Sequence, residues 1–224
     1  EARTSMYARR RRFAYYLILP SLVLITLLNL VPIIEGVIVS FQNHNMLRPN
    51  PDAFVGFKHY ARALQAGGDF WGSVWTTVIW TAGAVTGGYI VGLGLALLLN
   101  METKGRAIFR ALFLIPWVIP DVATALLWKW LYADEFGVLN FLLAKFSIID
   151  KPVLWLSDPN MAMAAVIFVQ VWKLYPVMFI VLLAALQNVP KELHEAAMID
   201  GASAVQRFWW VTMPFIRPTS VIIT

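Results

Sequence analysis

The stretch Met161–Leu186, MAMAAVIFVQVWKLYPVMFIVLLAAL, decides what kind of fold this chain has. Lys173 is the one charged residue of this stretch. The stretch is longer than the roughly 20 residues that a helix needs to cross a bilayer. We therefore expect an all-α integral membrane protein, a polytopic helical bundle with a basic N-terminal segment, 1–12, ahead of the membrane domain, 13–224. The expected spans are 13–40, 70–100, 109–132, 161–186 and 218 onward, with the sequence truncated at the start of the fifth.

Composition supports a membrane protein. Hydrophobic residues make up 59% of the chain and charged residues 14%, whereas soluble domains have roughly 45–50% and about 25%. Cysteine is absent, so disulfides and thiolate metal sites are excluded. The run Arg9–Arg12 before an apolar stretch is similar to a secretory signal, but that stretch continues to Ser40 with no small-residue cleavage site, which favours a retained span.

The net charge of +5 is explained by topology rather than by a nucleic-acid partner. With a cytoplasmic N-terminus, the inner segments hold eleven basic residues: Arg3, Arg9, Arg10, Arg11, Arg12, Lys104, Arg106, Arg110, Lys191, Arg207 and Arg217. The outer segments hold five: Arg48, Lys58, Arg62, Lys145 and Lys151. Because basic residues concentrate on the cytoplasmic side, we expect the N-terminus and the loop 187–217 to be cytoplasmic.

Glycines in the second expected span form small-xxx-small pairs, Gly83 with Gly87 and Gly88 with Gly92. Such pairs let helix backbones approach closely in lipid. We interpret them as a packing surface rather than as part of a transport pathway.

The polar loop after the fourth span is predicted to be a helix–turn–helix. Pro190 suits the first turn of a helix, and Gly201 can adopt the positive φ that ends one. A side chain at Gly201 is expected to strain this turn and to hold the two helices apart. Ser203 with Gln206 three residues later is a capping-box pattern that opens a second helix, expected to continue to Val211–Met213. Pro214 and Pro218 then lead into the next span.

This loop resembles the EAA loop of bacterial ABC-importer permeases, whose pattern is EAA-x3-G-x9-I-x-L-P. The matching residues are Glu195, Ala196, Ala197, Asp200, Gly201, Ala202, Ser203 and Pro214, with Val211 and Met213 as conservative departures. The segments FRALFLIPWVIPDVATALLWKWLYADEFGVLN, VWKLYPVMFIVLLAALQNVPKELHEAAMIDGAS and FVGFKHYARAL resemble the carbohydrate-type permeases of this superfamily. The resemblance covers nearly all of the chain from Phe13.

The resemblance implies a multi-pass protein of the bacterial inner (plasma) membrane that imports a sugar, polyol or related phosphoester by alternating access. It implies four partners: a second homologous permease, two cytoplasmic ABC ATPases and an extracytoplasmic solute-binding protein. No cofactor is expected on this chain. ATP and Mg²⁺ are expected on the ATPases, and loop 187–217 is expected to be the coupling helix that docks on them.

Polar residues within spans are expensive in lipid and are candidates for function. Asp121 lies in the third span, and the outer part of the fourth span contains Gln170, Trp172, Lys173 and Tyr175. An aromatic face beside hydrogen-bonding groups suits a sugar, so we interpret them as a substrate pathway. Alternatively, Lys173 and Lys129 extend to the interface and Asp121 pairs with a lysine. Pro116 and Pro120 should interrupt the helix near Asp121.

Two other functional classes were weighed. A secondary transporter or channel acting alone would show internal repeats and usually more spans, and no repeat is evident. A membrane enzyme would need an acid/base or metal cluster. His44, His59 and His194 lie in loops without metal-ligand spacing, and the phosphate-binding pattern GxxxxGK[ST] is absent, so ATP hydrolysis is expected elsewhere.

Overall fold

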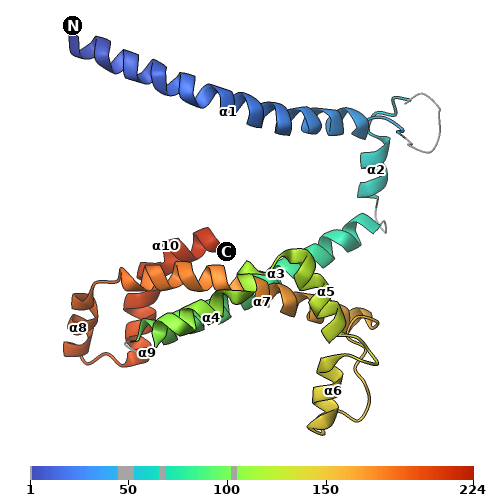
Figure 1. Ribbon diagram of the computed structural model, residues 1–224, viewed down its shortest axis with the longest axis vertical. Coiled ribbons are helices and arrows are strands. Elements are labelled where there is room, and N and C mark those ends of the chain that lie inside the picture. Colours follow the sequence, from blue (N-terminus) through green and yellow to red (C-terminus); the bar gives the residue numbers. More distant parts are fainter. Residues whose placement is uncertain (1, 45–52, 66–68, 102–104) are drawn as a thin grey trace. The chain divides into compact units, whose positions relative to one another are not determined.

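The structure, a computed structural model, describes residues 2–44, 53–65, 69–101 and 105–224 (Figure 1). Arg48 and Lys104, which entered the charge comparison, lie outside the described residues. The chain divides into two units, one ending at Val74 and one beginning at Trp75, and each is described by itself. Every regular element in the described residues is a helix, which confirms the all-α fold class.

The first unit contains α1 (Ala2–Ser40) and α2 (Lys58–Leu64). Residues Phe13–Ser40 of α1 are predominantly apolar, and none of its most apolar window is buried, as expected for a helix surrounded by lipid. After α1, the Phe41 ring meets the Phe57 ring edge-on at 5.2 Å and lies 5.5 Å from that of Tyr60. The Tyr60 hydroxyl lies 2.7 Å from the Ser40 hydroxyl, so α2 is fixed to the end of α1.

The second unit is built around two long helices, α3 (Asp69–Asn100) and α7 (Pro159–Gln187). Their contact surface on α3 is the set of glycines singled out in the sequence. A Cβ on Gly87 would lie 2.5 Å from the Val171 side chain, and one on Gly92 would lie 2.9 Å from Met178 Cβ and 3.0 Å from the Phe179 backbone nitrogen. The predicted packing role of these glycines is confirmed.

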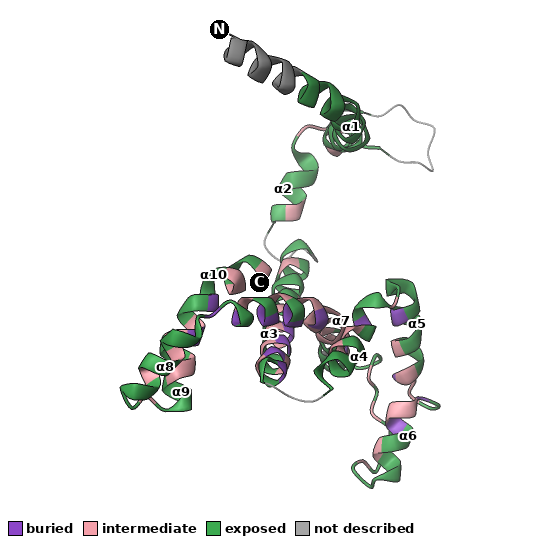
Figure 2. Cartoon of the chain, turned by 60° about the vertical axis from the view of Figure 1, so that its left-hand side comes forward, coloured by how far each residue is buried: buried purple, intermediate pink, exposed green. Residues whose placement is uncertain are grey.

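The core of the second unit lies where α3 and α7 meet α10 (Met213–Ile223). Figure 2 shows buried residues gathered along α3 and α7. Phe179, Leu182 and Ile216 are fully buried there. The Tyr89 and Ser220 hydroxyls, 2.8 Å apart, join α3 to α10.

The expected span 109–132 is not one straight helix. It consists of α4 (Arg106–Val118) and α5 (Asp121–Leu131), which are bent by 93° at the intervening break. Pro120 lacks a backbone N–H and so cannot continue the helical ladder, whereas Pro116 is accommodated within α4. The predicted interruption is confirmed at Pro120. The described residues contain three helices able to cross a membrane, or four if the bent pair counts as one.

A short hairpin after α5 contains α6 (Val138–Lys145) and is organised by one buried side chain. The Asn140 amide donates to the carbonyls of Asp134 and Val153, and its oxygen accepts from the Val153 N–H and the Trp155 indole, all within 3.0–3.2 Å. These four bonds saturate a group that would otherwise be costly to bury.

The C-terminal region contains α8 (Lys191–Ile199), α9 (Ala204–Arg207), the π-helical turn η1 (Phe208–Thr212) and α10. The last helix begins at Met213 rather than at the expected Pro218, which lies inside it. Thr212 keeps helical dihedrals of φ −67° and ψ −53°, so α9, η1 and α10 run into one another. The two prolines therefore do not separate the loop from the following helix: Pro214 lies in the first turn of α10, where its missing N–H is tolerated.

We expect Gly92→Ala to destabilise the second unit and Gly94→Ala to leave it nearly unchanged. A Cβ at Gly92 would meet Met178 Cβ, the Phe179 nitrogen and the Tyr175 carbonyl, whereas nothing lies within 4 Å of one at Gly94. Overpacking of this kind costs roughly 1–3 kcal/mol. Thermal unfolding of the purified protein measures both variants, and equal midpoints would contradict the glycine-packed interface.

Candidate functional site

The first candidate site is the helix–turn–helix at 187–217. Its first helix, α8, begins after Pro190 and ends at Ile199, with Asp200 as its C-cap. The Gly201 N–H donates to the Met198 carbonyl at 3.0 Å, and the Ala202 N–H donates to the Ala197 carbonyl at 2.9 Å. With Gly201 at φ +79°, these two bonds are those of a Schellman motif, which satisfies the last carbonyls of a helix. The turn predicted at Gly201 is confirmed.

The second helix of this site is fixed at its start by Ser203. The Ser203 hydroxyl accepts from the Gln206 N–H at 3.3 Å, and the Gln206 side chain accepts from the Ser203 N–H at 2.8 Å. This reciprocal pair is the predicted capping box. At its other end, the Met213 N–H donates to the Phe208 carbonyl, five residues back, which makes η1 a π-helical turn. Such turns are rare and often occur at functional sites.

The outer surface of the loop is unusually open for a segment with apolar residues. No residue of α8 is buried, and Ile199 is 87% exposed. Among the described residues, the carboxylates of Glu195 and Asp200 form no ion pair. The loop thus combines an internally capped backbone with free apolar and acidic groups, which is the form of a rigid docking surface.

Gly201 has a narrower role within the chain than the sequence suggested. A side chain there was expected to hold the two short helices apart, but nothing lies within 4 Å of a Cβ built at Gly201. That steric expectation is wrong within this chain. The glycine is needed for its positive φ, which costs an L-residue roughly 1–2 kcal/mol.

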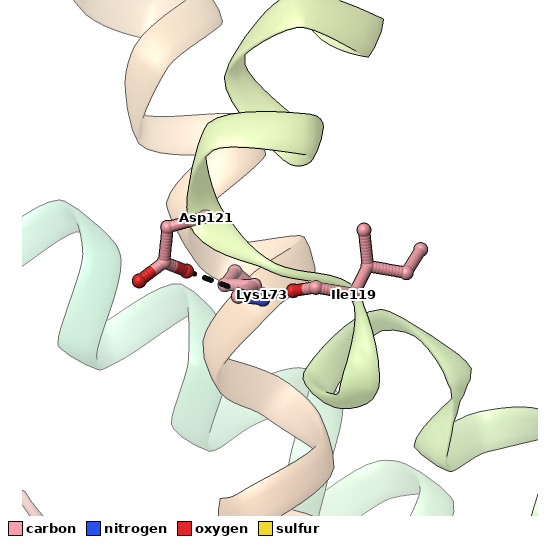
Figure 3. A network of polar contacts seen from close by, with 3 residues as sticks. All are labelled: Ile119, Asp121 and Lys173. Atoms are coloured by element: carbon pink, nitrogen blue, oxygen red, sulfur yellow. Dashed lines mark hydrogen bonds and ion pairs between the residues drawn. The ribbon is translucent and has the colours of Figure 1, made fainter.

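The second candidate site is the break between α4 and α5. Figure 3 shows Lys173 of α7 reaching between Ile119 and Asp121. Its ammonium group donates to the Ile119 carbonyl and lies 3.2 Å from the Asp121 carboxylate. The Lys173 side chain is 16% exposed and that of Asp121 is 91% exposed. The break therefore exposes a carboxylate at a point where a lysine satisfies a freed carbonyl.

The five predicted pathway residues do not form one cluster. Asp121 and Lys173 form an ion pair, which is the alternative to a substrate-binding role that the sequence left open for Asp121. Trp172 instead packs edge-on against Trp128 of α5, with ring centroids 5.5 Å apart. The Tyr175 carbonyl lies against Gly92 of α3, and Gln170 is half-buried without a side-chain hydrogen bond in the described residues.

Sequence reasoning missed an aromatic chain beside this break. Trp128 contacts Tyr132 and Phe168, and Tyr132 contacts Trp155, all with ring centroids 5.3–5.5 Å apart. Within the described residues, the buried Thr124 hydroxyl and the Trp128 indole N–H have no hydrogen-bond partner. The spacing of Thr124 and Trp128, four residues apart on α5, was the available signal, because it puts both on one face.

The fold and the first site together define a multi-pass membrane protein with a capped, exposed loop. Residues 84–223 match the family described as binding-protein-dependent transport system inner membrane component, and the chain belongs to that family. It is a permease subunit of an ABC importer and lies in the inner membrane, and it is not a catalytic subunit.

Relatives carry related transport names. The chain is 36% identical over 214 residues to the trehalose/maltose transport system permease protein MalF of Thermococcus litoralis, covering 96% of this chain and 71% of that protein. It is 34% identical to the sulfoquinovosyl glycerol transport system permease protein SmoG of Agrobacterium fabrum, covering 95% of this chain and 68% of that one.

A solved structure shares the fold. A bacterial ABC transporter involved in the import of the acidic polysaccharide alginate superposes with a TM-score of 0.79 at 24% identity, covering 99% of this chain and 73% of that one. The same kind of transporter in complex with an alginate pentasaccharide-bound periplasmic protein gives 0.80 at 24% identity, covering 96% and 70%.

We expect Lys173→Met to destabilise the protein more than Asp121→Asn. Removing the ammonium leaves the Ile119 carbonyl without its donor, at a cost of roughly 1–3 kcal/mol. Removing the Asp121 charge leaves the bond from the Lys173 ammonium to the Ile119 carbonyl in place, so its cost should be smaller. Thermal unfolding of the two purified variants decides the order, and the reverse order would show that the ion pair, rather than the carbonyl bond, maintains the break.

Proposed function

We propose that this chain moves a sugar, or a related polyol or phosphoester, into the cell by alternating access driven by partner ATPases. The observation that carries the proposal is the exposed helix–turn–helix with the EAA pattern, Glu195–Ala197 followed by Gly201. Its backbone is fixed by its own caps, so a force applied to α8 need not deform the loop. Nothing in the comparisons supports the alternative, a transporter or channel acting without ATPases.

The substrate class is supported by the names of relatives and by the residues near the break. The relatives are named for trehalose and maltose, for sulfoquinovosyl glycerol and, in Bacillus subtilis, for galactooligosaccharides. The rings of Trp128 and Trp172, which pack edge-on, offer stacking faces, and the exposed Asp121 carboxylate offers acceptors; both suit hydroxylated rings. The pathway of Asp121, Gln170, Trp172, Lys173 and Tyr175 stays a prediction.

The proposed partners are a second homologous permease, two cytoplasmic ATPases and an external solute-binding protein. In this arrangement ATP and Mg²⁺ bind to the ATPase subunits, and this chain itself binds no cofactor. The exposed apolar residues of α8, among them Met198 at 50% and Ile199 at 87%, supply a surface for a cleft on an ATPase. Glu195 and Asp200 supply acceptors for basic groups there.

We expect Gly201→Asp and Glu195→Lys to abolish most solute uptake while the permease still reaches the membrane. An aspartate at φ +79° strains the turn, and a lysine places like charges together if the partner group is basic. A loss of about 1.4 kcal/mol in the coupling contact corresponds to about tenfold weaker binding of the ATPase. Uptake is measured with the complete complex against labelled sugars and phosphorylated polyols, and ATPase activity is measured in parallel.

Two matched variants separate the causes. Gly201→Asn has nearly the same size as Gly201→Asp and a similar compatibility with a positive φ, but carries no charge, so uptake that is retained in Gly201→Asn and lost in Gly201→Asp identifies the added charge rather than the turn. Glu192→Lys changes another exposed carboxylate of α8 and should retain uptake. Normal uptake in both Gly201→Asp and Glu195→Lys would reject the coupling role, and no uptake of any solute by the wild type would reject the substrate class.

We also expect the N-terminus and loop 187–217 to face the cytoplasm, because the basic residues are distributed unevenly. The chain lacks cysteine, so Gln206→Cys, at an exposed position, introduces a unique thiol. A membrane-impermeant maleimide should label it only after the cells are opened. Labelling in intact cells would overturn the orientation.

A further inference from the structure

A pocket lies between the C-terminal ends of the two long helices and the helix–turn–helix loop. It occupies about 270 Å³ between the ends of α3 and α7 and the α8–η1 segment. The polar side chains of its lining are Asn100, His194, Arg207 and Thr212. The apolar side chains of its lining include Leu97, Leu186, Val189 and Phe208. This pocket is separate from the break at Ile119 and from the docking surface of α8.

Among the described residues, the lining of the pocket offers hydrogen-bond donors and contains no carboxylate. Arg207, although half-buried, forms no ion pair or side-chain hydrogen bond with any described residue, and the same is true of His194 and Asn100. Arginine cannot lose its charge in a protein. A half-buried guanidinium without a partner is unfavourable, so an anion in this pocket would be stabilised by a charge-assisted bond.

The position of the pocket indicates which kind of anion would bind there. It lies at the ends of the membrane-spanning helices α3 and α7, which finish at Asn100 and Gln187. Helix ends at this point lie at the level of the lipid headgroups, and the exposed indoles of Trp209 and Trp210 (57% and 75%) on η1 suit such an interface. The apolar lining residues next to Arg207 suit a phosphate group that carries an apolar tail.

We propose that Arg207, His194 and Asn100 form a binding site for a phosphate group, supplied by an anionic lipid headgroup or by free phosphate. The guanidinium binds two phosphate oxygens side by side, and the imidazole and the carboxamide donate to the others. The site joins Asn100 of α3 to His194 of α8 and Arg207 of α9, so its occupant would fix the position of α9 against the ends of α3 and α7.

The experiment uses the complete complex, stripped of lipid in neutral detergent and without ATP. Three probes are titrated calorimetrically: dioctanoyl phosphatidylglycerol, inorganic phosphate, and dioctanoylglycerol, which has the same tails and no phosphate. We expect the phosphatidylglycerol affinity to fall by about tenfold or more in Arg207→Gln and less in His194→Gln and Arg207→Lys. Arg217→Gln changes an exposed arginine outside the pocket and should not alter it.

The three probes distinguish an anionic lipid headgroup from free phosphate as the source of the bound phosphate group. Binding of phosphatidylglycerol alone identifies a lipid site, and equal binding of inorganic phosphate identifies a free-anion site. Binding of dioctanoylglycerol as strong as that of phosphatidylglycerol, or equal affinities in wild type and Arg207→Gln, would overturn the proposal. Arg207→Lys keeps the charge, so a folded Arg207→Lys complex provides the comparison if Arg207→Gln fails to assemble. Because no turnover is measured, the result is independent of the coupling role.

Discussion

The close approach of α3 and α7 is the constraint on which the second unit depends. Lipid tails are as apolar as leucine, so helices in a membrane associate through tight contact rather than through the hydrophobic effect. Gly92 lets the α3 backbone reach the Phe179 nitrogen and the Tyr175 carbonyl of α7. Ala96 and Leu99 of α3 then meet Leu182 and Leu186 of α7, and Ile216 of α10 joins the same cluster.

The same α7 helix also maintains the break in the neighbouring span. Backbone polar groups within a bilayer must be satisfied by protein, because no water is present. Pro120 interrupts the ladder, and Lys173 donates to the Ile119 carbonyl. The hydrogen bond to the Ile119 carbonyl therefore explains why the Lys173 side chain, only 16% exposed, lies between the helices. One face of α7 packs on glycines and another supports the bend, so disturbing the α3–α7 seam would also disturb the geometry beside Asp121.

Local chemistry could be predicted from the sequence, whereas contacts between distant residues could not. The Schellman turn at Gly201 and the capping box of Ser203 and Gln206 depend on neighbours within a few residues, and both were predicted correctly. The 93° bend required knowing where Lys173 lies relative to Ile119, 54 positions away. The continuity of α9, η1 and α10 was missed because Pro214 and Pro218 suggested a boundary. Pro214 instead occupies the tolerated first turn.

The Asn140 hub shows the same limit, since its partners are Asp134, Val153 and Trp155, which follow no helical or strand period. The C-terminal continuity that the sequence missed matters most for function. A flexible linker between α8 and the membrane helices would absorb displacement. Here the linker is a four-bond turn and cap, then uninterrupted helix to Ile216, which is fully buried against α7, and to Ser220, which bonds Tyr89 of α3. In the proposed mechanism, a movement of α8 reaches the glycine-packed pair through rigid contacts alone.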